Sequence, residues 1–163
     1  DLLVLPMFGE RKPRPFRNTP FIETEGRFSP DGRWVAYVSD ESGQREVYVE
    51  SFQVDGPGEG ARWRISTAGG SQPVWRRDGK ELFYLAADNK LMSVSVKSGQ
   101  EFSVESPTAL FRIDPSGGGG FYDVTRDGQR FLVNTSVTRA ESLPITVVVN
   151  WTASLRSGPL RNR

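Results

Sequence analysis

The pattern of apolar and polar residues predicts short β-strands separated by turns, and no stretch has the period of an amphipathic helix of useful length. The clearest stretch is FSPDGRWVAYVSD, residues 28–40, in which the apolar run Trp34–Val38 follows Asp31-Gly32. Asp and Gly tolerate the left-handed backbone of a hairpin turn, and Pro30 cannot donate to a strand ladder, so the first strand should end there. The nearly continuous apolar run predicts a strand that is covered on both faces.

The same unit occurs two more times along the chain. In each copy a large apolar residue lies three places before the Asp, and an apolar run is under way by the fourth place after it. The Asp residues are 47 and 49 positions apart, and four-stranded propeller blades recur at roughly 40–50 residues. The pattern therefore predicts structural turns at Asp31, Gly32, Asp78, Gly79, Asp127 and Gly128.

Taken in order, these units predict an all-β chain that forms a partial β-propeller over residues 1–155. Two complete four-stranded blades are expected at about 24–67 and 72–112, with parts of two flanking blades at 1–20 and 120–155 and a frayed tail at 156–163. A closed propeller has about 4–8 blades, so this chain should not close a ring alone.

Several finer expectations follow from the local pattern. Residues 46–52 alternate and predict a half-buried strand, and the glycine-rich run at 55–60 predicts an exposed turn. The basic, proline-broken segment 11–16 predicts an outermost edge strand or a loop. The fourth strand of the second blade is expected at 109–112, and a further strand at 145–151.

Composition narrows the range of functions. The 163 residues carry a net charge of +1, which gives no electrostatic basis for binding nucleic acid or an anionic membrane, and no window is apolar enough to be a transmembrane helix. Histidine and cysteine are absent, so the chain holds no Ser-His-Asp or Cys-His catalytic set, no thiolate metal site and no disulfide. The chain begins at Asp1 within an apolar run, which suggests a segment of a longer protein.

Other candidate sites have simpler interpretations. Each Asp-Gly turn offers one carboxylate where calcium needs six to eight oxygens, so turn chemistry is favoured and neither a metal nor a cofactor is expected. The glycine run 117–120 lacks the lysine and hydroxyl of a phosphate loop. The basic clusters Arg11–Arg14 and Arg76-Arg77 are expected to be solvated surface residues. Asp40, Glu41 and Asp123 are expected to be solvated loop charges. The tryptophans are expected to pack between blades; they are Trp34, Trp63, Trp75 and Trp151.

The repeats carry a resemblance to known proteins. FSPDGRWVAYVSD, VWRRDGKELFY and VTRDGQRFLV resemble the WD40-like propeller repeats of the TolB type (PD40 repeats). Three further segments resemble the C-terminal propeller region of bacterial receptor-type serine/threonine protein kinases. They are Met7–Pro13, GGSQPVWRRDGKELFYL and PITVVVNWTASL. The second and third copies carry Arg where the family's turn has Ser-Pro. The resemblance implies a sensor or interaction domain on the periplasmic side of a membrane-anchored protein.

Three functions are compatible with these observations. The leading hypothesis is a non-catalytic binding module, not an enzyme, that presents loops to a protein or peptide ligand. The alternative is the accessory propeller of a prolyl-oligopeptidase-type serine peptidase, whose G-x-S-x-G motif and histidine would lie in another domain. A polysaccharide-cleaving propeller would need clustered carboxylates or a metal. Because a partial propeller leaves open edges and apolar flanks, we also expect a homodimer.

Overall fold

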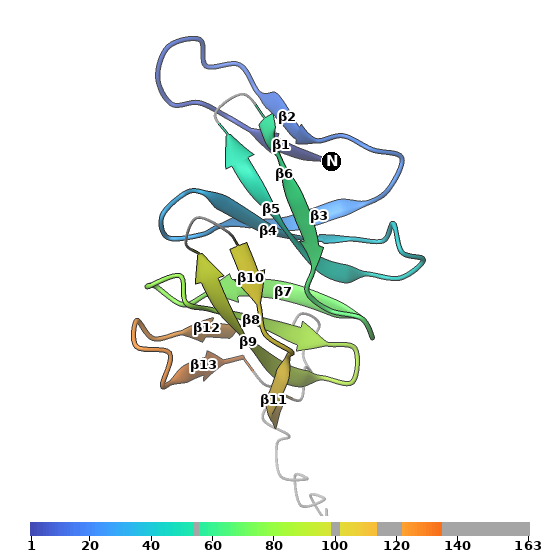
Figure 1. Ribbon diagram of the computed structural model, residues 1–163, viewed down its shortest axis with the longest axis vertical. Helices are drawn as coiled ribbons and strands as arrows, with labels where there is room; N and C mark the ends of the chain where they lie inside the picture. The colour runs from blue at the N-terminus through green and yellow to red at the C-terminus, as the bar shows by residue number, and fades with distance from the viewer. Residues whose placement is uncertain (54–55, 99–101, 114–121, 135–163) are drawn as a thin grey trace, which may run out of the picture.

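The computed structural model describes residues 1–53, 56–98, 102–113 and 122–134, and within them it contains β-strands and no helix. No helix of the described residues is long and apolar enough to cross a membrane. Four antiparallel sheets are stacked along the long axis of the molecule (Figure 1). The protein is therefore all-β, and the arrangement is that of a partial β-propeller.

The first complete blade is a four-stranded sheet in the order β3-β4-β5-β6. Its strands are β3 (Glu23–Phe28), β4 (Trp34–Ser39), β5 (Glu46–Gln53) and β6 (Gly56–Arg64). All six residues of β4 are buried, as the continuous apolar run predicted, because another sheet covers each face of this blade.

Two expectations for this blade were wrong. The run at 55–60 is not one exposed turn: Gly56 and Pro57 pair with Gln53 and Phe52, so β6 begins at Gly56. Glycine and proline are tolerated there because β6 is an edge strand. The strand β5 is also not half-buried, since its first five residues are all buried, including the acidic Glu46 and Glu50.

The second blade has three regular strands and a divided fourth. The strands are β7 (Gly70–Trp75), β8 (Glu81–Ala86), β9 (Lys90–Ser98), β10 (Phe102–Val104) and β11 (Thr108–Arg112). The single fourth strand expected at 109–112 is instead two strands along β9: β10 pairs with Val96–Ser98 and β11 with Lys90–Ser93. The nine-residue β9 is long enough for both, and Pro107, which has no N–H to donate, lies between them.

Two short hairpins flank the complete blades. The strands β1 (Leu2–Val4) and β2 (Arg14–Arg17) pair at one end, so the basic segment does contribute an edge strand. The strands β12 (Tyr122–Val124) and β13 (Phe131–Val133) pair at the other end. The strand expected at 145–151 and the tail at 156–163 lie outside the described residues.

The hydrophobic cores of the described residues lie between the sheets. The largest core joins the two complete blades and includes Trp34, Val49, Leu82 and Val94. A second core, with Phe16 and Tyr37 among its members, joins β1–β2 to the first blade, and a third joins the second blade to β12–β13. Each complete blade therefore uses both of its faces for packing, which is the geometry of stacked propeller blades.

The first strands of successive blades are also tied together by hydrogen bonds. Glu25 and Gln72 hold equivalent places in β3 and β7, where a register shift gives each a positive φ of 59° and 55°. The backbone N–H of Gln72 donates to the carboxylate of Glu25, and the Tyr122 hydroxyl donates to the backbone carbonyl of Gln72 at 2.9 Å. The Trp75 indole N–H donates to the carbonyl of Arg27 at 3.2 Å.

Candidate functional site

The three Asp-Gly pairs form turns with one shared geometry. Each glycine has a positive φ, and its N–H donates at 2.9 Å to the carbonyl three residues earlier. Each Asp Oδ1 accepts the backbone N–H two residues later, at 3.0–3.1 Å. The φ values are 71° for Gly32, 72° for Gly79 and 72° for Gly128, and the acceptors are Asp31, Asp78 and Asp127. The carboxylates are therefore engaged within their own turns.

The residue two places before each Asp differs among the copies. Ser29 and Thr125 each donate a hydroxyl to their Asp at 2.5 Å. In the second copy Arg76 replaces the hydroxyl and donates to both oxygens of Asp78 at 2.8 and 2.9 Å, which lowers the pKa of that carboxyl. Among the described residues no group of three or more acidic side chains could hold a metal ion.

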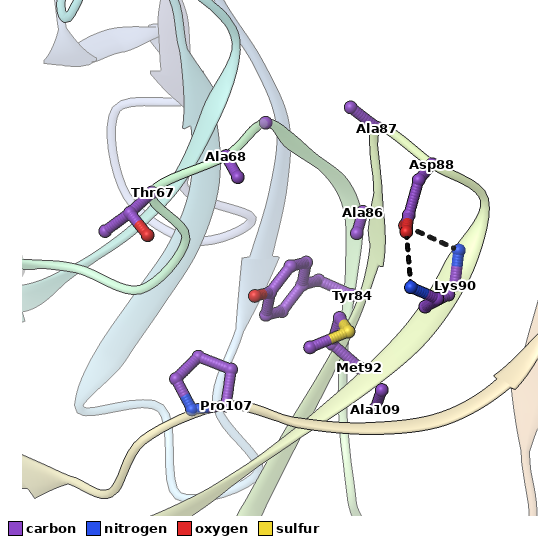
Figure 2. Close-up of a pocket in the computed structure, with 11 residues that line it drawn as sticks. Thr67, Ala68, Tyr84, Ala86, Ala87, Asp88, Lys90, Met92, Pro107 and Ala109 are labelled. Atoms are coloured by element: carbon purple, nitrogen blue, oxygen red, sulfur yellow. Dashed lines mark hydrogen bonds and ion pairs between the residues drawn. The ribbon is translucent and has the colours of Figure 1, made fainter.

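A hollow of about 650 Å³ lies at the opposite ends of the strands, between the two complete blades (Figure 2). One wall is the loop that joins β6 to β7, the floor comes from β8 and β9, and the segment entering β11 closes the outer side. We call this hollow the outer pocket. Its lining residues are Thr67, Ala68, Gly69, Tyr84, Ala86, Ala87, Asp88, Lys90, Met92, Pro107 and Ala109.

Tyr84 provides the central chemical group of the outer pocket. It projects from β8 on the face that packs against the first blade, next to Leu82 in that core, and only 4% of the residue is exposed. Its hydroxyl makes no hydrogen bond to any described residue. Figure 2 shows the hydroxyl directed into the space between Thr67 and Pro107. Burial, with a smaller contribution from the charge of Glu46, raises the pKa of Tyr84 to about 12, so the hydroxyl stays protonated and available as a donor.

Glu46 fixes the wall of the outer pocket. This buried carboxylate accepts hydrogen bonds from the Ser66 hydroxyl, from the Gly69 N–H at 3.1 Å and from the Gln44 side chain at 2.6 Å. The Ser66 hydroxyl also accepts the backbone N–H of Val47 at 2.8 Å. The loop between the blades is thus anchored to β5, and the outer pocket is held open on a rigid frame.

An ion pair borders the outer pocket on its exposed side. The Lys90 ammonium lies 2.7 Å from the Asp88 carboxylate, and both side chains are about half exposed. The hydrogen bond from Lys90 holds the pKa of Asp88 below its usual range. The largely apolar lining carries the Tyr84 and Thr67 hydroxyls and meets charge at its exposed edge, which is typical of a binding site.

A second hollow of about 270 Å³ continues from the first toward the inner strands of the blades. The two hollows share Gly69 and Ala87. A Cβ built on Gly69 would lie 2.7 Å from the Ala87 Cβ, and Gly69 has a φ of 85°, so a side chain there would be both crowded and strained. We call the second hollow the inner pocket; its other lining residues are Gln44, Arg45, Gly70, Ser71 and Leu85.

Sequence reasoning did not identify Tyr84, Glu46 or Gly69 as site residues. The available signal was a pair of small-residue runs, 68–70 and 86–87, at the ends of strands in neighbouring blades. The tryptophans behave as expected where they are described: Trp34 and Trp63 meet edge to face with centroids 5.5 Å apart and pack in the core between the blades. Trp151 and the glycine run 117–120 lie outside the described residues.

Comparison with known proteins agrees with this fold. Residues 22–101 match the family model described as prolyl oligopeptidase, N-terminal beta-propeller domain. The match contains the whole first blade and the second blade through β9, and it therefore includes most of the lining of the outer pocket. No curated protein matches the chain. Over just under half of its length, this β-propeller chain is thus similar to the propeller domain of a peptidase family.

Proposed function

We propose that this chain is a non-catalytic propeller module that binds a protein or peptide segment in the cleft between its two complete blades. The observation that carries the proposal is the Tyr84 hydroxyl, which lies on a deeply buried ring, faces the outer pocket and has no partner among the described residues. Because this hydroxyl opens onto the outer pocket and stays protonated, a ligand acceptor placed there would gain a hydrogen bond that no described residue supplies.

The shape and lining of the outer pocket agree with such a ligand. Met92, Pro107 and the small residues around Tyr84 offer apolar contact, and the pocket opens directly to solvent. Because the surrounding walls are anchored through Glu46, the site is largely formed before binding, which limits the entropy lost on association.

A nuclear magnetic resonance titration of the full chain tests the proposal. We would add the blocked residues N-acetyl-leucine amide and N-acetyl-glycine amide to the ¹⁵N-labelled protein. The leucine compound should shift the backbone signals of Thr67, Ala86 and Lys90, and the glycine compound should shift them less. Tyr84→Phe should weaken the leucine effect about threefold to tenfold, the usual range for one neutral hydrogen bond. An absence of shifts at these residues with both compounds would contradict the proposal.

Two larger proteins could contain such a module. The match over residues 22–101 supports the accessory propeller of a prolyl-oligopeptidase-type serine peptidase. The resemblance of the repeats and of the PITVVVNWTASL segment supports a receptor-type serine/threonine kinase, which would place the propeller outside the cytoplasmic membrane. The sequence of the complete gene product separates the two, because a G-x-S-x-G motif followed by a histidine marks the first and a kinase domain the second.

The non-catalytic part of the proposal has its own test. The chain alone should leave a fluorogenic prolyl peptide uncleaved, because it contains no histidine to serve as a general base. Hydrolysis that co-purifies with the chain and disappears in the Tyr84→Phe variant would show that the module is itself an enzyme.

A further inference from the structure

The outer and inner pockets adjoin, and we call the pair the groove. They meet at Gly69 and Ala87, which line both. At this meeting point one residue has no side chain and the other has a single methyl group, so no long side chain separates the two hollows. The groove runs along the boundary between the blades, from Pro107 at its outer end to Ser71 on the innermost strand β7.

The chemistry of the groove changes along its length. The outer pocket combines apolar walls with the Tyr84 hydroxyl. The inner pocket is bordered by Arg45, whose side chain is 56% exposed. One nitrogen of its guanidinium, Nη2, binds Glu25 at 2.8 Å and Thr24 at 3.2 Å. Its other N–H groups donate to none of the described residues, so the guanidinium is held in place while part of its donor set remains open.

We propose that the groove binds an extended peptide that carries an aliphatic side chain for the outer pocket and, two residues away, an acidic side chain for Arg45. This inference rests on the proposed function, which supplies the outer pocket as a binding site. In an extended chain, residues i and i+2 project to the same side, so one strand can fill two hollows with a single backbone crossing between them.

The three parts of the groove take three parts of this ligand. The peptide backbone passes over Gly69 and Ala87, where the small side chains allow close approach. The Tyr84 hydroxyl donates to a backbone carbonyl, and the open side of the Arg45 guanidinium donates to the carboxylate, which is the stronger, charge-assisted bond. A compact ligand would fill only one of the two hollows.

The test compares short peptides on the full chain by the same titration. The probes are acetyl-Leu-Ser-Glu-amide and its reverse, acetyl-Glu-Ser-Leu-amide, because the structure does not fix the direction of the backbone. Glutamine and alanine versions replace the acidic and aliphatic residues in turn. The tighter of the two parent peptides should shift signals in both pockets, including Ser71 and Arg45. Its glutamine version should bind about tenfold more weakly, the loss of one charge-assisted bond.

Three variants locate the contacts. Arg45→Met should weaken the acidic peptide about tenfold and leave the glutamine version unchanged, whereas Arg33→Met, on an exposed arginine of an Asp-Gly turn, should change neither. Ala87→Leu, at an exposed position that lines both pockets, should obstruct the crossing and abolish the shifts that the peptide causes at Ser71. Unchanged dispersion of the other signals verifies that each variant is folded.

The outcomes separate the two proposals. If N-acetyl-leucine amide shifts the outer pocket but no peptide shifts Ser71, or if Arg45→Met and Ala87→Leu leave peptide affinity unchanged, the extended-peptide inference is wrong and the outer pocket remains a binding site. If neither the blocked leucine nor any peptide perturbs the outer pocket, the proposed function is wrong as well.

Discussion

The three Asp-Gly turns allow a prediction with an internal control, because the same substitution meets the same backbone in three surroundings. Gly32, Gly79 and Gly128 have nearly identical positive φ values. Alanine in this left-handed region costs roughly 1–2 kcal/mol, and its smaller unfolded-state entropy returns about 0.4–1 kcal/mol. Gly→Ala should therefore destabilise each turn by about 1 kcal/mol on conformational grounds alone.

The surroundings then separate the three sites. A Cβ at Gly32 meets nothing within 4 Å, and one at Gly79 makes an ordinary contact of 3.8 Å with Pro30. A Cβ at Gly128 would lie 2.6 Å from the Arg76 Cδ. Arg76 must then move away from Asp78 and Glu81, with which it forms partly exposed ion pairs at 2.8 Å. Such pairs contribute about 0.2–1 kcal/mol each, so Gly128→Ala should cost about 1.5–2.5 kcal/mol.

Denaturant unfolding measures this series directly. The midpoint should fall by a similar amount for Gly32→Ala and Gly79→Ala, and by more for Gly128→Ala, with the slope of the transition unchanged. The double variant Gly128→Ala with Arg76→Ala should show less than additive loss, because the crowded side chain is already gone. A neutral or stabilising effect at Gly32 would refute the reasoning, since nothing but left-handed backbone strain distinguishes that site.

Three further predictions concern buried groups and assembly. Glu50→Ala should destabilise the protein by about 2–4 kcal/mol in denaturant unfolding, because it removes the partner of two other side chains. Arg17 lies 3.0 Å from the Glu50 carboxylate, and the Tyr37 hydroxyl donates to it at 3.0 Å. Glu50→Gln should lose less, and equal losses would mean that charge is unimportant there. Burial raises the pKa of Tyr84 to about 12 from an unfolded value of 10.0. The stability that the protonated hydroxyl contributes is therefore complete below pH 10 and is lost as the pH rises toward 12. Tyr84→Phe should make the unfolding free energy fall less steeply over this pH range. Light scattering over a concentration series should give a dimer mass, and a constant mass near 18.2 kDa would exclude the expected homodimer.

Local sequence information was sufficient for the elements that depend on short-range chemistry. The strand β8 begins at Glu81 and ends at Ala86, where the apolar run after Asp78-Gly79 predicts it. The pattern could not predict that β9 would pair with two separate strands, because Phe102–Val104 is a short run whose partner, Val96–Ser98, is chosen by the packing of Phe102 against Trp34 and Trp63.

The outer pocket was harder to predict because its lining residues are ordinary in sequence. Tyr84 resembles any other core residue in an apolar run, and its hydroxyl faces a pocket because residues 67–69 and Pro107, which are distant in sequence, line the space around it. From the alternating pattern, Glu46 and Glu50 are expected on the solvent-exposed face of a strand. They are buried because distant residues, Ser66 and Arg17, supply their donors, and such partners follow from the fold and not from neighbouring positions.

The placement of the cores between sheets also determines how cooperative this protein can be. In the described residues each large apolar cluster is shared by two neighbouring sheets, so a single blade cannot bury its apolar residues without its neighbours. Folding free energy therefore resides in nearest-neighbour interfaces, as in a linear array of repeats. Among the described residues the two-stranded sheets β1–β2 and β12–β13 each share one of these cores, whereas each complete blade shares two. Within this described part, the interface of the two complete blades should accordingly open after the interfaces with the two-stranded sheets, and the outer pocket at that interface should be among the last features to be lost.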